Sequence, residues 1–178
     1  MADKTQSPFW RFSLALYSQP GVPPACLALQ DKHGVDVNVM LYGLWLATQG
    51  RMLSSGDMER IDAAVGPWRS EVVVPLRGVR RVLKEPADAF ATPETAALRD
   101  RIKAVELEAE RLQQEALFRL KQPAECGERE PGLTTAAQAN LEAYAQALGA
   151  LFDPQAQSAL LAGLEALAAA GKLTDKIT

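Results

Sequence analysis

The chain has 178 residues, of which 48% are hydrophobic and 23% are charged, and this composition is typical of a single globular domain. A net charge of -3 argues against a dedicated nucleic-acid-binding protein, because such domains are usually basic. The apolar run over residues 35–45 is interrupted by polar side chains and is shorter than the roughly 20 residues that span a membrane. The first residues lack the pattern of a secretory signal, so we expect a cytoplasmic protein with no membrane span.

Several kinds of chemistry are disfavoured by the residues present. The chain has two cysteines, Cys26 and Cys126, and one histidine, His33, which leaves no ligand set at zinc spacing. We expect both cysteines to be free thiols, with Cys26 buried. No glycine-rich phosphate or dinucleotide motif and no nucleophile-elbow motif occurs. We therefore predict no metal, no cofactor and no catalytic residue, and a non-enzymatic protein is favoured.

Capping and stop signals predict five short helices in residues 1–90. Ser7-Pro8 begins the first, Pro23-Pro24 the second, Asp36 caps a third over residues 37–49, Ser54 or Ser55 begins the fourth and Gly66-Pro67 the fifth. The third helix is apolar around nearly its whole circumference, so we expect it to be central and buried. Pro75 predicts a kink or a break around residues 73–75, and an extended segment there is the alternative.

A single long helix is predicted after Thr92-Pro93, because no glycine or proline follows until Pro123. Apolar residues recur along it at alternating four- and three-residue steps, as in a coiled coil. This seam consists of Leu98, Ile102, Val105, Ala109, Leu112 and Ala116. The helix would be roughly 45 Å long, so we expect part of it to project or to need a partner.

The C-terminal part predicts an alanine-rich hairpin of two helices. The first is expected to begin at Thr134 or Thr135 and the second at Asp153-Pro154, after a linker over residues 123–132. We expect the hairpin to pack against the long helix. The fold class is therefore all-α, with an N-terminal bundle at 1–90, the long helix at 92–122 and the hairpin at 133–178, together forming one structural domain.

A set of short motifs carries a resemblance to a known family. They are Phe9-Trp10-Arg11-Phe12-Ser13, Cys26-Leu27, Asp36-Val37-Asn38, Leu44-Trp45-Leu46-Ala47, Trp68-Arg69 and Val73-Val74-Pro75-Leu76-Arg77. Over roughly residues 7–120 the chain resembles an uncharacterised family of short, mostly proteobacterial proteins that is known only as a domain of unknown function. The resemblance implies an all-helical cytosolic protein and supplies no catalytic residues.

The first candidate site is polar and lies at the start of the third predicted helix. Asn38, Tyr42 and Trp45 share one helix face with spacings of four and three residues, next to Asp36. One amide, one phenol and one indole on an apolar face are typical of the lining of a small-molecule pocket. The alternative is structural, with Asp36 as an N-cap and the two aromatic residues in the core.

The second candidate site is a basic stripe near residue 80. It consists of Trp68, Arg69, Arg77, Arg80, Arg81 and Lys84. Arginines at helical spacing suit carboxylate or phosphate groups of a partner. The alternative is that the stripe pairs with the protein's own acids, including Glu106, Glu108 and Glu110, or is simply solvated.

These features favour a cytosolic binding or adaptor protein that holds a protein partner with the basic stripe and the long helix. Self-association through the seam is part of this hypothesis. The alternative is a small-molecule-binding protein or an enzyme with a pocket near Asp36, Asn38, Tyr42 and Trp45, where Asp36 would be the base. The third hypothesis is weak nucleic-acid or phosphate binding through the stripe.

Overall fold

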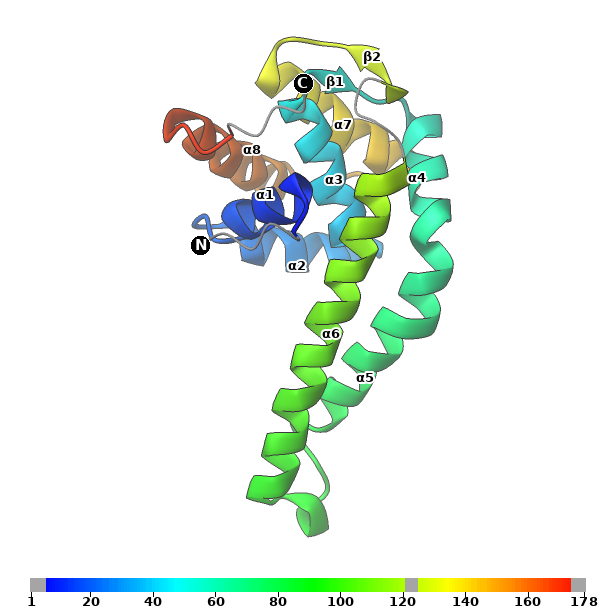
Figure 1. The fold of residues 1–178 in the computed structure, drawn as a ribbon, viewed down its shortest axis with the longest axis vertical. Helices are drawn as coiled ribbons and strands as arrows, with labels where there is room; N and C mark the ends of the chain where they lie inside the picture. The colour runs from blue at the N-terminus through cyan, green and yellow to red at the C-terminus, as the bar shows by residue number, and fades with distance from the viewer. Residues whose placement is uncertain (1–5, 121–124, 174–178) are drawn as a thin grey trace.

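The computed structural model describes residues 6–120 and 125–173, and this part of the chain is almost entirely helical (Figure 1). The prediction of an all-α fold is confirmed. Within these residues, none of the helices has both the length and the apolar character needed to span a membrane.

The first three helices begin at the predicted residues or, for the second helix, one residue earlier. They are α1 (Pro8–Tyr17), α2 (Val22–His33) and α3 (Val37–Thr48). Ser7 Oγ accepts a hydrogen bond from the backbone amide of Trp10 at 3.1 Å, and Asp36 accepts one from the amide of Asn38 at 2.9 Å. Each acceptor satisfies a backbone donor that the first turn of a helix leaves free.

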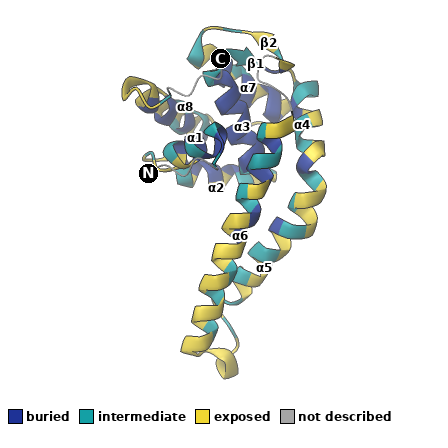
Figure 2. Ribbon diagram, viewed as in Figure 1, coloured by how far each residue is buried: buried dark blue, intermediate teal, exposed yellow. Residues whose placement is uncertain are grey.

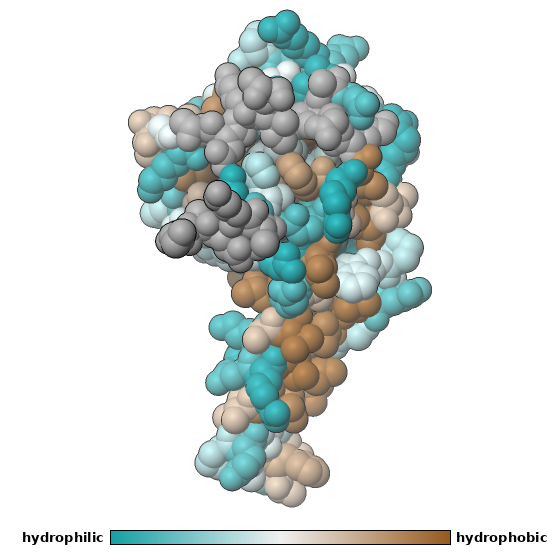
Figure 3. Space-filling view, in the orientation of Figure 1, coloured by the Kyte–Doolittle hydropathy of each residue, from teal (hydrophilic) through white to brown (hydrophobic). Residues whose placement is uncertain are grey.

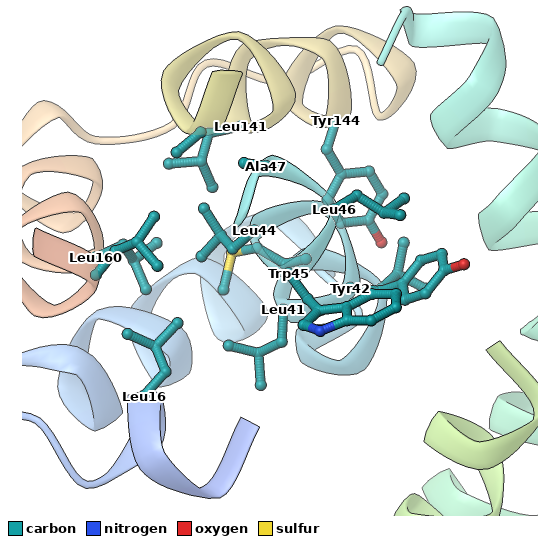
Figure 4. Packing of buried hydrophobic residues seen from close by; sticks show 14 of the residues in the cluster. Leu16, Leu41, Tyr42, Leu44, Trp45, Leu46, Ala47, Leu141, Tyr144 and Leu160 are labelled. Atoms are coloured by element: carbon teal, nitrogen blue, oxygen red, sulfur yellow. The ribbon is translucent and has the colours of Figure 1, made fainter. Parts of the chain in front are cut away.

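Helix α3 lies at the centre of the core, as its apolar sequence predicts. Figure 4 shows Leu44 and Trp45 of α3 among side chains from α1, α7 and α8, including Leu16, Leu141 and Leu160. Because α3 is apolar all round, it has to be covered on every side, and helices from both ends of the chain do so.

The region after α3 departs from the prediction at Gly66-Pro67. Helix α4 (Ser55–Trp68) runs through these residues instead of ending at them, and a π-helical segment η1 (Arg69–Val73) joins it to α5 (Val74–Val82). The amide of Val74 donates to the carbonyl oxygen of Arg69, five residues back. Pro75 has no amide to donate, so the irregular turn forms where a kink was expected, and the extended alternative is wrong.

The long helix α6 (Pro93–Leu120) is confirmed, and it forms a projecting arm with α5 and the short 3-10 helix η2 (Asp88–Phe90) (Figure 1). Figure 2 shows that this arm is mostly exposed, whereas the buried residues gather around α3. The buried residues of α6 are Glu106, Ala109, Gln113, Gln114 and Leu117. Ala109 is the one member of the predicted seam among them, and the other seam residues are partly or well exposed.

The C-terminal helices α7 (Leu133–Ala147) and α8 (Pro154–Ala169) form the predicted hairpin, but its main contacts are not with α6. Helix α7 packs on α3 and α4, and α8 packs on α2. Ala136 and Ala137 are fully buried, and such small side chains let α7 approach the apolar surface of α3 closely. A two-stranded antiparallel ribbon, β1 (Arg51–Met52) and β2 (Glu128–Arg129), was not predicted. Pro123 of the predicted linker lies outside the described residues.

Gly163 sets the close approach of α8 to α2. A Cβ atom at this position would lie 2.6 Å from Val22 Cγ2 and 3.3 Å from Leu16 Cδ1. We expect Gly163→Ala to lower the free energy of unfolding by about 1–3 kcal/mol, because overpacking forces neighbouring atoms apart. Urea denaturation followed by circular dichroism measures this loss, and Val22→Ala in the same chain should restore part of it.

Gly78 provides a matched control for this substitution. It lies within α5, and a Cβ atom there would meet nothing within 4 Å. Gly78→Ala should therefore raise stability by about 0.5–1 kcal/mol through helix propensity alone. Equal effects at Gly78 and Gly163 would contradict the packing argument.

Candidate functional site

A groove of about 590 Å³ lies where the arm meets the body of the protein. Its walls come from α1, α2, the start of α3, η1, α5 and α6. Small-molecule binding sites usually have volumes in this range, with mostly apolar walls and a few placed polar groups.

The walls of the groove carry half-exposed apolar side chains. Leu14 and Tyr17 come from α1, Leu27 from α2 and Leu107 from α6, and they are 38–51% exposed. Three helices thus present large apolar side chains to one concave surface. Such side chains, gathered in one place instead of scattered, are typical of binding surfaces.

The floor of the groove is a buried polar cluster around Asp36. Asp36 Oδ2 accepts hydrogen bonds from Gln113 Nε2 at 2.6 Å and from Arg69 Nη1 at 3.0 Å. Asn38 Nδ2 donates to Gln113 Oε1 at 3.3 Å, and Gln114 Nε2 donates to Asn38 Oδ1 at 2.7 Å. Because Asp36 also caps α3, its two oxygens accept three hydrogen bonds, an arrangement that does not favour a role as a catalytic base.

Arg69 connects this cluster to α4 and α7. Its guanidinium group forms a bidentate pair with Asp62 at 2.7 and 3.1 Å, and the hydrogen bonding to Asp62 is the main reason that the pKa of Arg69 is raised. Tyr144 Oη donates to Asp62 Oδ1 at 2.8 Å and accepts from the backbone amide of Asp36 at 3.1 Å. Burial, together with the nearby Asp62, raises the pKa of the Tyr144 phenol. The network therefore joins five segments of the chain at the floor of the groove, namely the start of α3, α4, η1, α6 and α7.

The central arginines of the basic stripe are bound to acids of α6. Arg77 contacts Glu106 at 3.0 Å, Glu110 at 2.7 Å and Gln30 at 2.8 Å, and Arg80 also pairs with Glu106. Burial would raise the pKa of Glu106, but the hydrogen bonds from Arg80 and Arg77 outweigh it and lower the pKa. Burial raises the pKa of Glu110 despite its contact with Arg77. These pairs hold α5 against α6.

The other predicted stripe residues lie in different settings. Trp68 is 38% exposed, and its indole Nε1 donates to the carbonyl oxygen of Ala109 at 3.0 Å, which anchors α4 to α6. Arg81 lines the groove and lies 3.7 Å from Asp31, with both side chains at least 60% exposed. Lys84 does not line the groove and lies 3.9 Å from Glu85. The groove thus has a basic edge at Arg81, while the stripe as a whole is divided.

The structure separates the four residues of the first candidate site. Asp36 and Asn38 line the groove, whereas Tyr42 and Trp45 are almost completely buried. The Phe9 ring lies 5.1 Å from Tyr42 and 5.6 Å from Trp45 between centroids, so α1 packs on both rings. Tyr42 lines a separate, smaller cavity of about 130 Å³. Burial raises the pKa of the Tyr42 phenol, which lies beside Cys126 and outside the groove.

Two buried polar atoms at the groove have no hydrogen-bond partner within the described part of the chain. They are Ser13 Oγ and Gln114 Oε1, on residues that are each 3% exposed. An unsatisfied buried polar atom is costly, and a ligand or a water molecule that enters the groove can satisfy it. One hydroxyl and one amide oxygen, both buried beneath the surface of the groove, thus lack a partner among the described residues.

Sequence reasoning did not select several residues of this site, namely Ser13, Asp62, Gln113, Gln114 and Tyr144. One signal was available: two consecutive glutamines, Gln113 and Gln114, stand in a helix whose other polar residues are mostly charged. Uncharged amides are suited to burial with partners, whereas charged side chains favour solvent. Among the described residues, no three His, Cys, Asp or Glu side chains are grouped to hold a metal ion.

The fold and the groove define a small all-α protein with a polar-floored groove between its body and its arm. The chain belongs to a family of proteins of unknown function, DUF2390, whose profile matches residues 8–117. The matched segment contains every residue that lines the groove. No curated protein and no solved structure matches the chain.

Proposed function

We propose that this protein is a non-enzymatic binding or adaptor protein that holds a short segment of a partner protein in the groove. The observation that carries the proposal is the convergence of Leu14, Tyr17, Leu27 and Leu107 on one concave surface. An amphipathic segment that lays its apolar side chains in such a groove is a common mode of recognition between proteins.

The chemistry of the partner segment follows from the edge of the groove. Arg81 and Lys103 line the groove and are exposed, and the contact of Arg81 with Asp31 is a solvent-exposed pair of the kind that contributes little. A carboxylate of the partner can replace Asp31 at small cost. The proposed partner segment therefore carries two or three large apolar side chains with Asp or Glu beside them.

A peptide-display selection against the immobilised full chain tests this proposal. We expect the selected peptides to combine apolar and acidic residues, and Leu107→Glu to weaken their binding at least about tenfold, or 1.4 kcal/mol. Leu151→Glu is the matched control, because Leu151 is 89% exposed and lies outside the groove. Selected peptides that bind Leu107→Glu as well as the unmodified chain would overturn the proposal.

Among the arginines of the basic stripe, Arg81 is a better position than Arg77 or Arg80 for testing the role of charge in peptide binding. Substitution of Arg77 or Arg80 would deprive the buried Glu106 of a partner and would destabilise the protein, which confounds binding with folding. Arg81→Glu should weaken acidic peptides several-fold at low salt, and the effect should shrink as salt screens the charges.

A small-molecule ligand is the second candidate, favoured by the unsatisfied Ser13 hydroxyl and Gln114 amide oxygen. A compound held there should raise the melting temperature of the protein to an extent set by its concentration relative to Kd. The shift should be lost in Gln114→Leu and retained in Leu107→Glu. Binding of compounds without any response to Gln114→Leu would reject this candidate.

A further inference from the structure

Part of the seam of α6 is uncovered. Leu98, Val105 and Leu112, which we name the outer row, are 38%, 51% and 40% exposed. Figure 3 shows apolar side chains gathered along the arm, on the face where α6 borders α5. Helix α5 adds Val79 and Val82, 47% and 70% exposed, to the apolar surface of the arm. An isolated monomer rarely exposes a contiguous row of this kind.

The spacing of the outer row is symmetric about its middle residue. Leu98 and Leu112 each lie seven residues, or about two helical turns, from Val105, so the row runs for about 21 Å along one side of α6. When two such rows are placed antiparallel, Val105 meets Val105 and Leu98 meets Leu112 of the second copy. The row is thus complementary to itself, as an interface with a two-fold axis requires.

Two charged residues flank the outer row on its free edge. Arg101 and Glu108 are seven residues apart and both are exposed, so they border the row on the same side. Arg101 lies four residues before Val105 and Glu108 lies three residues after it. Their distances from Val105 along the helix axis therefore differ by only one residue, or about 1.5 Å. An antiparallel pair therefore brings Arg101 of each copy opposite Glu108 of the other, and charges beside an apolar seam set the orientation of paired helices.

The existing contact of Glu108 does not prevent this pairing. Glu108 receives hydrogen bonds from Arg111 in the same helix, at 2.8 and 2.6 Å, but the Glu108 side chain is 55% exposed. Exposed pairs of this type contribute little, so Glu108 can bind Arg101 of a second copy while keeping Arg111 nearby.

We infer that two copies of this chain associate through α6 in an antiparallel homodimer centred near Val105. The arms form a four-helix layer in which the outer rows of the two copies cover each other and Arg101 pairs with Glu108 twice. The inference is independent of the groove, because Leu107 lies two residues after Val105 and faces a different side of α6.

Sedimentation velocity on the full chain tests the association. We expect a dimer for the unmodified protein and a monomer for Val105→Glu, with an unchanged circular dichroism spectrum because Val105 is half-exposed in the monomer. Leu107→Glu on the groove side of the same helix is the control and should remain dimeric. An unmodified chain that stays monomeric up to its solubility limit would overturn the inference, whatever the peptide selection shows.

The orientation has its own test. Arg101→Glu and Glu108→Arg should each weaken the dimer about tenfold or more, and the double variant should restore it, because the exchanged charges again face each other. Val105→Cys should form an intermolecular disulfide on mild oxidation, since the native Cys26 and Cys126 are buried. A double variant as weak as the single variants, together with no cross-link in the Val105→Cys variant, would rule out the antiparallel dimer.

Discussion

Arg69→Ala is expected to lower the free energy of unfolding by about 3 kcal/mol and the melting temperature by about 10 °C. Urea denaturation and a thermal melt, both followed by circular dichroism at neutral pH, measure the two effects. The expected loss is large because one guanidinium group neutralises two carboxylates, Asp36 and Asp62, that come from different segments of the chain.

The burial of the two acids sets the size of this effect. The Asp36 side chain is 4% exposed and that of Asp62 is 21% exposed, whereas Arg69 itself is 30% exposed. Removal of one partner of a buried ion pair leaves the other charge without compensation, which usually costs about 3–5 kcal/mol. Because Arg69 is partly exposed, water can reach the space that its side chain leaves. The expected loss in the free energy of unfolding is therefore at the lower end of this range.

Two further variants separate charge from geometry. Arg69→Lys keeps the positive charge but cannot form the bidentate contact with Asp62, so an intermediate loss is expected. Arg60→Ala removes an arginine from α4 whose side chain is 71% exposed and pairs locally with Asp57, so it should change stability by less than about 0.5 kcal/mol. Similar losses in the free energy of unfolding for Arg60→Ala and Arg69→Ala would contradict a stabilising role of the network at the floor of the groove.

The local chemistry of the sequence was sufficient to predict most helix starts. Ser7, Asp36 and Thr92 each accept a hydrogen bond from an amide two or three residues later, so the cap and the helix are specified within one turn. The same reasoning predicts a helix start at Gly66-Pro67, and this prediction is wrong. The contacts of Trp68 with α6 and of Arg69 with Asp62 hold the next turn in place, and they outweigh the local cost of a proline inside α4.

The candidate site was harder to predict because its partners are distant in sequence. Asp36 and Asn38 were selected, but nothing local to them indicates that Gln113 and Gln114 would bind them. The heptad pattern leaves open whether the apolar stripe of α6 faces the interior or a partner. In this protein the buried face includes Glu106 and the two glutamines, because α5 and the start of α3 bring polar partners to that side. A buried polar face can be recognised only when the helices that pack on it, and the polar partners that they bring, are also known.

Asn140→Ala is expected to lower the free energy of unfolding by about 3 kcal/mol. Asn140 is 2% exposed, and its side chain connects α7 to α3 and to the region of β1. Its Nδ2 donates to the carbonyl oxygens of Gly43 at 2.9 Å and Arg51 at 3.0 Å, and its Oδ1 accepts from the amide of Leu53 at 2.6 Å. Alanine leaves these backbone groups buried without this partner, and urea denaturation measures the cost.

The matched control for Asn140 lies half a turn away. Gln138→Ala removes an exposed amide that donates to Glu142 in the same helix, so it should change stability by less than about 0.5 kcal/mol. Asn140→Asp should be more damaging than Asn140→Ala at neutral pH, because a carboxylate would face two carbonyl oxygens. That variant should regain stability as pH falls, since a protonated carboxyl group can donate a hydrogen bond and is favoured in the folded state.

The Asn140 variants also test how the family-matched segment depends on the C-terminal hairpin. Residues 8–117 contain the groove, but α7 lies outside them and supplies both Asn140 and Tyr144, which contacts Asp36 and Asp62 below the groove. Loss of the Asn140 contacts should therefore loosen α7 and weaken peptide binding in the groove more than Gln138→Ala does. Unchanged peptide affinity in a destabilised Asn140→Ala variant would show instead that the groove is held by α1 to α6 without help from α7.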